Sequence, residues 1–317
     1  MGDQILLLLS YMLIFGVSLM FVALGGMFSE RSGVINIGLE GTMVIGGFCG
    51  FATLKAMQEA SVAAPVTVIV TILVGILAGM AYSLLLAVVC INFKADQTLT
   101  GTALNLLATA LTLVLTKMMN DGAATTISYV KDAFIFDFGV FDINIFLIIA
   151  IVVLIVSIFV LYRLRFGLRL RACGENPSAA DSVGINVIKY RYAGVLISGA
   201  LAGIGALAYI IPTTNNWNAS TGVAGFGFLA LAIMIFGQWK PLRIGIISLI
   251  FSFFLSLSYV YSGIFRAMGI EINASMGVTP ELFRMLPFIV SLVILAFTSK
   301  KSRAPKAEGI PYDKSLR

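Results

Sequence analysis

Long apolar stretches recur along the whole chain, and each is close to the length that a membrane crossing requires. Crossing a hydrocarbon core of about 30 Å takes roughly 20 apolar residues in a helix. With 59% hydrophobic residues, 11% charged residues and no histidine, the composition excludes a soluble protein with a polar surface. The sequence predicts an all-α polytopic membrane protein with about nine transmembrane helices, at residues 5–28, 41–54, 66–93, 98–116, 143–162, 192–212, 223–238, 243–261 and 284–299.

The distribution of lysine and arginine predicts the orientation of these spans. If the C-terminus is inside, the inner loops hold 16 of the 21 Lys and Arg residues and the outer loops hold 5. Cytoplasmic loops normally carry the excess of positive charge. We therefore expect the N-terminus outside, with the C-terminus and the polar segment 163–191 inside. The first apolar stretch lacks a basic leader and an A-x-A-like cleavage site, so we expect a retained helix.

The cysteines and the basic C-terminal segment fit this orientation. Cys49 and Cys90 fall within spans and Cys173 falls inside, so no disulfide is expected. The segment "KKSRAPK" is interpreted as an inner anchor near anionic lipid rather than as a nucleic-acid contact.

Several kinds of chemistry are missing from the sequence. No Asp, Glu, Lys or Arg falls inside an expected span, and the nearest are Glu40, Arg243 and Arg284 at the edges. Ion-coupled carriers usually keep such residues at membrane depth. Without histidine there is no H-E-x-x-H metal site or Ser-His pair, and no G-x-x-x-x-G-K-[ST] motif occurs. We expect no catalytic residues, no metal and no bound cofactor, so any energy source lies in another chain.

Uncharged polar residues form one face of the fourth span. They follow one another at steps of three and four residues, which places them on a single helix stripe: Thr98, Thr102, Asn105, Thr109, Thr112 and Thr116. Their side chains either bond their own backbone and hold neighbouring helices together, or they line a polar path. The sequence leaves both interpretations open.

Small residues recur at a spacing of four residues, and once of three, in three other spans. This spacing lets helix backbones approach closely in lipid, so we interpret these faces as packing surfaces. The sets are Gly75, Gly79, Ser83 and Ala87; Gly194, Ser198 and Ala202; and Gly245, Ser248, Ser252 and Ser256.

Two glycine-rich passages interrupt the apolar pattern just before a helix starts. They are "SERSGVINIGLEG" at 29–41 and "STGVAGFGFLAL" at 220–231. In transporters built from two related halves, helices broken at matching places often form the site, with their N-termini aimed at polar ligand groups. The alternative is ordinary loops with tight packing. On the first interpretation we expect a substrate path that includes Asn36, Glu40, Thr102, Asn105, Thr109, Gly225 and Phe226.

The polar segment contains the signals of a short helix. Asn176 suits the N-cap, Pro177 the first helical position and Gly184 the position after the end, so a helix is expected over 177–183. Its apolar face would comprise Ala179, Ala180 and Val183. Small side chains on such a helix suit a groove on another protein, and the alternative is a helix lying on lipid.

Three passages carry a resemblance to a known family. "GENPSAADSVGINV" resembles the cytoplasmic loop of ABC importer permeases of the branched-chain amino acid and ribose type. "GGMFSERSGVINIGLEGTMVIGGF" and "GFGFLALAIMIFGQWKP" are similar to the subgroup that imports nucleosides and simple sugars. With the span pattern the resemblance covers nearly the whole chain, although larger relatives begin with one more helix.

The resemblance implies a permease domain over 1–303, with a coupling loop at 163–191 and a cytoplasmic tail at 304–317, in the cell (inner) membrane. It implies a cytoplasmic ABC ATPase subunit that uses ATP and Mg, a second related permease in a heterodimer, an extracellular substrate-binding lipoprotein and a nucleoside substrate. It assigns ATPase coupling to Gly174, Glu175, Asn176, Pro177, Ala179, Ala180, Val183 and Gly184.

Other functions stay open beside this one. A permease for simple sugars is one alternative, and an ATP-independent secondary carrier or channel is another. A membrane enzyme or scaffold is disfavoured because catalytic residue types are missing.

Overall fold

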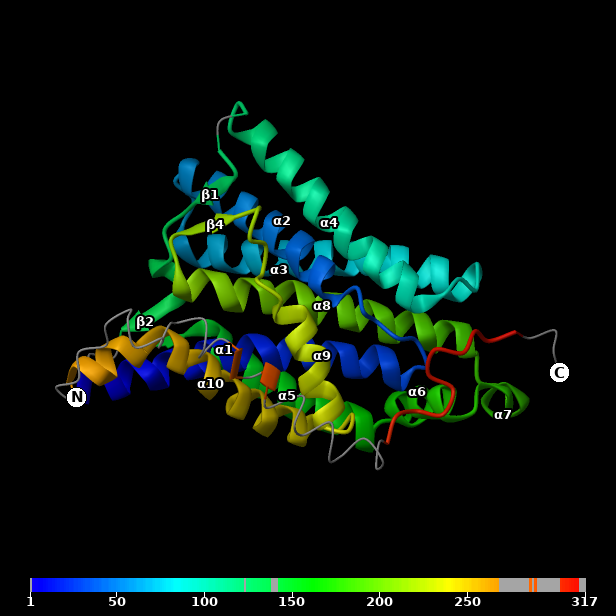
Figure 1. Ribbon diagram of the computed structural model, residues 1–317. Helices are drawn as coiled ribbons and strands as arrows, with labels where there is room; N and C mark the ends of the chain where they lie inside the picture. The colour runs from blue at the N-terminus through cyan, green and yellow to red at the C-terminus, as the bar shows by residue number, and fades with distance from the viewer. Residues whose placement is uncertain are drawn as a thin grey trace.

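A computed structural model of the chain describes residues 2–122, 124–137, 142–267, 285–286, 288–289 and 303–313. These residues are mostly helical (Figure 1). The helix α3 continues into a short π-helix, Val88–Asn92. The α-helices are α1 (Gly2–Arg31), α2 (Leu39–Glu59), α3 (Ala64–Ala87), α4 (Gln97–Met119), α5 (Ile145–Arg163), α6 (Arg165–Glu175), α7 (Pro177–Ser182), α8 (Val187–Thr213), α9 (Phe226–Phe236) and α10 (Pro241–Ala267).

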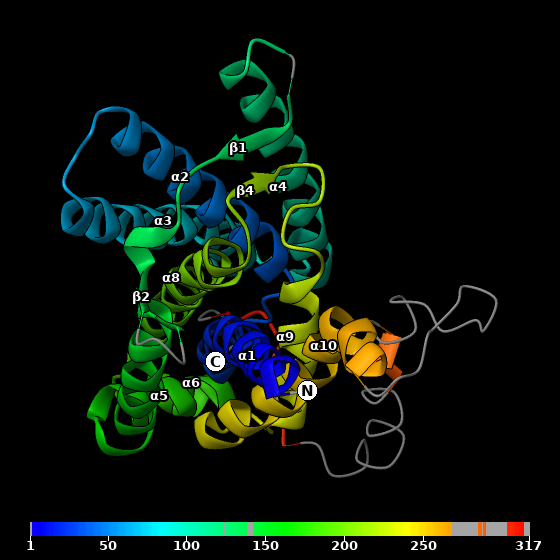
Figure 2. The same ribbon diagram turned by 90° about the vertical axis from the view of Figure 1, so that its left-hand side faces the viewer.

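The helices α1 and α8 form the centre of the bundle. They pack against each other along their length, with α2 and α3 on the α8 side and α10 and α5 on the α1 side (Figures 1 and 2). The second half of α1 is buried almost without interruption, from Phe15 to Glu30. A helix that is apolar all round belongs in such a central position.

Six helices in the described part of the chain are long and apolar enough to cross a membrane: α1, α3 with its π-helical extension, α4, α5, α8 and α10. Apolar side chains face outward on several of them. On α5, for example, Ile148, Ile151 and Ile155 are each more than half exposed. The prediction of a helical polytopic membrane protein is confirmed. The ninth expected span, 284–299, lies largely outside the described residues.

Two expected spans differ from the helices that form. The helix α2 is 21 residues long, where the apolar stretch 41–54 predicts a shorter one. The helix α9 has 11 residues, which at 1.5 Å per residue is about 16 Å, or half of a hydrocarbon core. The backbone angle φ is +54° at Ala224 and +83° at Gly225, and such left-handed residues end the helix on its N-terminal side. The segment 223–238 therefore provides a half-length helix.

The small residues are packing positions, as expected. A Cβ added at Gly79 would lie 2.2 Å from the carbonyl oxygen of Gly199, and one added at Gly203 would lie 2.2 Å from that of Gly75. The α8 face that meets α3 therefore contains Gly199 and Gly203. The predicted α8 stripe, which includes Gly194, instead meets α1, where an added Cβ would lie 2.8 Å from the carbonyl oxygen of Phe28.

Short strands, which the all-α prediction omitted, join two loops at one end of the bundle. β1 (Thr126–Ser128) pairs antiparallel with β4 (Asn216–Asn218), with Ile127 opposite Trp217. β2 (Ile135–Asp137) pairs with β3 (Asp142–Asn144) in the same way. These strands lie at the end of α1 that carries the N-terminus, and α6 and α7 lie at the opposite end (Figure 1).

Candidate functional site

The two glycine-rich passages meet in the interior of the bundle. Just before α2, the Asn36 amide Nδ2 donates a hydrogen bond of 2.9 Å to Ser198 Oγ, and Ser198 lies near the middle of α8. At the start of α9, the ring of Phe226 contacts the ring of Phe15 edge-on, with centroids 5.8 Å apart, and Phe15 lies halfway along α1. Both α2 and α9 therefore begin deep between longer helices.

One carboxylate joins the two helix starts. Glu40, at the second position of α2, accepts a hydrogen bond of 2.8 Å from Gly225 N on Oε1 and one of 2.7 Å from Gly227 N on Oε2. A Cβ at Gly227 would lie 2.5 Å from Glu40 Cα, so glycine is needed for this approach. The first amides of a helix lack intrahelical partners and carry partial positive charge, and an anion satisfies both conditions.

Glu40 lies at the start of its helix, as expected from the sequence. This start, however, lies inside the bundle, between longer helices. Irregular backbone at membrane depth is tolerated only where its polar groups find partners in the protein. The carboxylate of Glu40 supplies those partners.

Asn105 of α4 holds the first passage from the other side. Its Oδ1 accepts a hydrogen bond of 2.7 Å from Gly41 N, and its Nδ2 donates one of 3.0 Å to Ile37 O. Both ends of the amide are used, which supports the helix-joining interpretation for this residue. The Oδ1 atom of the buried Asn36 has no hydrogen-bond partner among the described residues.

Three threonines of the α4 stripe, Thr102, Thr109 and Thr112, donate hydrogen bonds to the backbone of their own helix. The hydroxyl of Thr109 donates to Asn105 O at 3.1 Å, and that of Thr102 donates to Leu99 O at 2.9 Å. Thr112 and Thr116 are buried, whereas Thr102 and Thr109 are exposed on the surface of this chain. A role for these two in a substrate path stays a prediction.

Gly225 and Phe226 line a cavity of about 380 Å³ beside the start of α9. Tyr209 of α8 and Tyr259 of α10 line it too, and the sequence analysis had not singled them out. The spacing of tyrosines in an apolar span does not show whether a given tyrosine lines a cavity or packs against another helix. Their proximity depends on how three helices meet.

At the other end of the site, the polar segment forms the short helix that its capping residues predict. Asn176 Oδ1 accepts a hydrogen bond of 3.0 Å from Ala179 N, Pro177 begins α7, and Gly184 has φ of +84° just after the C-cap Val183. The prediction of a helix here is confirmed. The preceding helix α6 was not expected, because arginines interrupt the apolar pattern of its sequence.

The apolar face predicted for this helix is divided in the structure. Ala180 is 4% exposed and packs against Cys173 and Val187 of the same chain, whereas Val183 is 75% exposed and Ala179 is also exposed. Ala180 therefore holds α7 on the protein, and Val183 projects from it. The three do not form a single docking surface.

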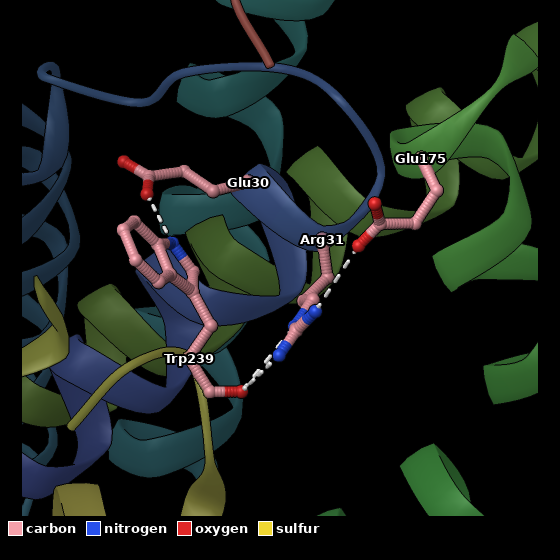
Figure 3. A network of polar contacts seen from close by, with 4 residues as sticks. All are labelled: Glu30, Arg31, Glu175 and Trp239. Atoms are coloured by element: carbon pink, nitrogen blue, oxygen red, sulfur yellow. Dashed lines mark hydrogen bonds and ion pairs between the residues drawn. The ribbon is translucent and has the colours of Figure 1, made fainter. Parts of the chain in front are cut away.

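A polar network links this segment to the end of α9 (Figure 3). Arg31, the last residue of α1, forms an ion pair of 3.7 Å with Glu175 and donates to the Trp239 carbonyl oxygen at 3.2 Å. The Trp239 indole donates to Glu30 Oε2 at 2.5 Å. Gly174 reinforces the link, because a Cβ there would lie 2.4 Å from the Arg31 carbonyl oxygen.

The sequence analysis missed the three central members of this network, Glu30, Arg31 and Trp239. Glu30 is 4% exposed, although it had been counted as part of a loop. All three lie within the passages that resemble the permease family, and this resemblance was the one sequence signal that could have pointed to them.

Part of the C-terminal tail docks on the same region. Ala307 N donates to Gly174 O at 2.8 Å, and Arg191 Nη1 donates to Ile310 O at 3.0 Å. Pro305 and Ala307 are buried, while Arg303 and Lys306 are exposed. The tail expected to anchor on lipid thus packs on the protein over these residues, and lipid contact by its basic groups stays a prediction.

The arrangement defines a class of protein. Apolar helices surround two helix starts in the bundle interior, and a network connects one of these broken segments to a helix projecting from the bundle end. Among the described residues no group of three or more His, Cys, Asp and Glu side chains could hold a metal. Discontinuous helices of this kind are typical of membrane transport proteins.

Comparison with known proteins specifies the class. The family described as "Branched-chain amino acid transport system / permease component" matches residues 8–295. The nucleoside ABC transporter permease protein NupC of Lactococcus lactis subsp. cremoris (strain MG1363) is 38% identical, over 98% of this chain and 97% of the relative. The guanosine ABC transporter permease protein NupQ of Bacillus subtilis (strain 168) is 37% identical, over 96% of each chain.

A shorter match is to the nucleoside ABC transporter permease protein NupB of the same Lactococcus lactis strain, which is 30% identical over 34% of this chain and 30% of that protein. No solved structure matches the chain significantly. The chain belongs to the permease family of branched-chain amino acid transport systems, and the resemblance and multi-pass membrane location predicted from sequence are confirmed.

Proposed function

We propose that this chain is a membrane-spanning permease subunit of a nucleoside importer, energised by a separate cytoplasmic ATPase. We infer the substrate class from the similarity to a nucleoside permease and a guanosine permease, which extends along nearly the whole of each chain. The N-terminus would be outside and α6, α7 and the tail inside, in agreement with the charge distribution.

The complex would contain further subunits. An ABC ATPase would bind and hydrolyse ATP with Mg, and an extracellular lipoprotein would deliver the substrate. The shorter match to NupB supports pairing with a second, related permease. The exposed apolar faces of α3, α4 and α5 provide surface for such a partner or for lipid.

We propose that α7 docks in a groove of the ATPase through its projecting side chains, Ala179 and Val183. A displacement of α7 would move Glu175, which pairs with Arg31, and Arg31 in turn holds the Trp239 carbonyl in the turn after α9. The half-length helix α9 would then shift against α2 at the Glu40 contact. Such a shift between two broken segments would open the path to one side of the membrane at a time.

The sequence also led us to expect two related halves in this chain, and we propose that α2 and α9 are corresponding helices of these halves. Each begins in the bundle interior after a glycine-rich passage, and the two starts share one carboxylate. Substrate would pass beside this junction, near Asn36, Gly225 and Phe226.

Val183→Glu tests the docking of α7. Because Val183 is 75% exposed, the change leaves the packing of this chain intact, whereas Ala180 is too buried for such a test. An unpaired charge in a dry contact costs about 3 kcal/mol or more, or roughly a 100-fold loss of affinity for the ATPase. The measurements are co-purification of the ATPase and nucleoside uptake by the reconstituted complex, and both should fall sharply.

Val183→Leu is the matched control, because it keeps an apolar side chain at the same position. It should retain both ATPase binding and uptake. If Val183→Glu binds the ATPase and transports as the unmodified protein does, α7 is not the docking element.

A further inference from the structure

The cavity beside the start of α9 has an aromatic wall. Its lining includes Tyr209, Phe226, Tyr259 and Phe288, together with Thr221 and Gly225. Its volume of about 380 Å³ falls within the roughly 300–1,000 Å³ of small-molecule sites. Small-molecule sites commonly combine such aromatic walls with a few polar groups.

The rings of this wall are held in place from behind. Tyr209 and Phe226 stack with centroids 3.8 Å apart and planes 19° apart, and both contact Phe15 edge-on. The ring of Tyr259 lies 5.4 Å from that of Tyr11 and 5.0 Å from that of Phe15. Tyr259 itself is 44% exposed. A supported ring with this much open surface is a ready platform for another flat ring.

The absence of charged side chains among the described lining residues indicates which class of ligand fits the cavity. None of the described residues that line the cavity is Asp, Glu, Lys or Arg. A charged amino acid entering here would lose its hydration without gaining a counter-charge. An uncharged ligand with a flat heterocycle avoids that cost and gains by stacking on the aromatic wall.

We propose that this cavity is a transit site for the base of the transported nucleoside, with the Tyr259 ring as its stacking platform and Tyr209 and Phe226 as the rigid wall behind. The proposal rests on the proposed function of nucleoside import and specifies how the substrate is recognised. The site adjoins the Glu40 junction through Gly225, so movement of α9 would alter its shape.

The test compares two variants at Tyr259 in the complete reconstituted transporter, with guanosine as the probe. Tyr259→Leu removes the ring and should lower guanosine uptake efficiency by roughly 10-fold to 100-fold, the range expected for losing one base-stacking contact. Tyr259→Phe keeps the ring and should stay within about twofold of the unmodified protein. Tyr261→Leu, on the same helix but outside the cavity lining, is the matched control and should transport normally.

A second measurement separates recognition from a folding defect. In Thr221→Cys, made in a background without the native cysteines, the aromatic rings of the cavity are retained and the new thiol lies in the lining. Guanosine should protect this thiol from a small alkylating reagent, and free ribose should not, because ribose has no flat heterocycle to stack. Normal guanosine uptake by Tyr259→Leu, or equal protection by ribose, would overturn this inference. Absence of guanosine uptake by the unmodified complex would instead contradict the proposed function.

Discussion

At the scale of single residues, Glu40 connects the starts of two helices inside the bundle. Its carboxylate accepts hydrogen bonds from two backbone amides at the start of α9. Each buried amide that loses its acceptor costs about 1–3 kcal/mol. A carboxylate here therefore keeps a half-length helix attached at membrane depth.

Glu40→Ala should lower the melting temperature of the purified permease strongly, because it leaves Gly225 N and Gly227 N unpaired. Glu40→Gln retains one acceptor oxygen and should fall between alanine and the unmodified protein. The measurement is thermal unfolding in detergent. Glu59→Ala, an exposed acid at the end of the same helix, is the control and should change little. If Glu40→Ala and Glu59→Ala have the same melting temperature, Glu40 does not hold α9 to α2.

At the scale of elements, the docked tail connects parts of the chain that are distant in sequence. Residues 303–313 contact the end of α6, the start of α8 and the break after α1. The carboxyl of Glu308 in this segment lies beside the buried carboxyl of Glu30. Burial raises the pKa of the Glu308 carboxyl, although the Glu30 hydrogen bond and the Arg31 charge act in the opposite direction.

This raised pKa predicts a pH-dependent tail. The docked state holds a proton more tightly than the free tail does, so docking is favoured most below the ordinary carboxyl pKa and weakens as the pH rises through the raised value. Hydrogen-exchange protection of residues 303–313, corrected for intrinsic exchange rates, should therefore decrease as the pH rises.

Glu308→Gln should stay protected over the same range, because an amide does not ionise. An equal loss of protection in the variant and the unmodified protein would show that Glu308 is not the responsible group.

At the scale of the whole molecule, the strands and the short helix α7 lie at opposite ends of the bundle (Figure 1). A membrane-impermeant thiol reagent applied to intact cells should label Asn216→Cys and should not label Ser178→Cys, in a background without the native cysteines. Both positions are exposed in this chain, so access depends on the side of the membrane. Labelling of Ser178→Cys from outside would reverse the proposed orientation.

Much of the architecture follows from the sequence alone. Apolar length predicts the membrane class and most of the spans, because a bilayer imposes that length on any helix that crosses it. The helix α7 is also predictable, since Asn176, Pro177 and Gly184 act within a few residues of one another. Small-residue spacing likewise indicates the tight packing of α3, because close approach requires missing side chains.

The site depends on contacts that no local pattern contains. Glu40 and Gly225 are 185 positions apart, and Arg31 and Trp239 are 208 apart, so their pairing exists only once the bundle has formed. For the same reason, Ala180 and Val183 differ in burial, although the sequence placed both on one apolar face. Ala180 packs against α6 and α8, whereas Val183 is exposed. Local chemistry thus determined where helices form, and tertiary packing decided which polar groups meet inside the bundle.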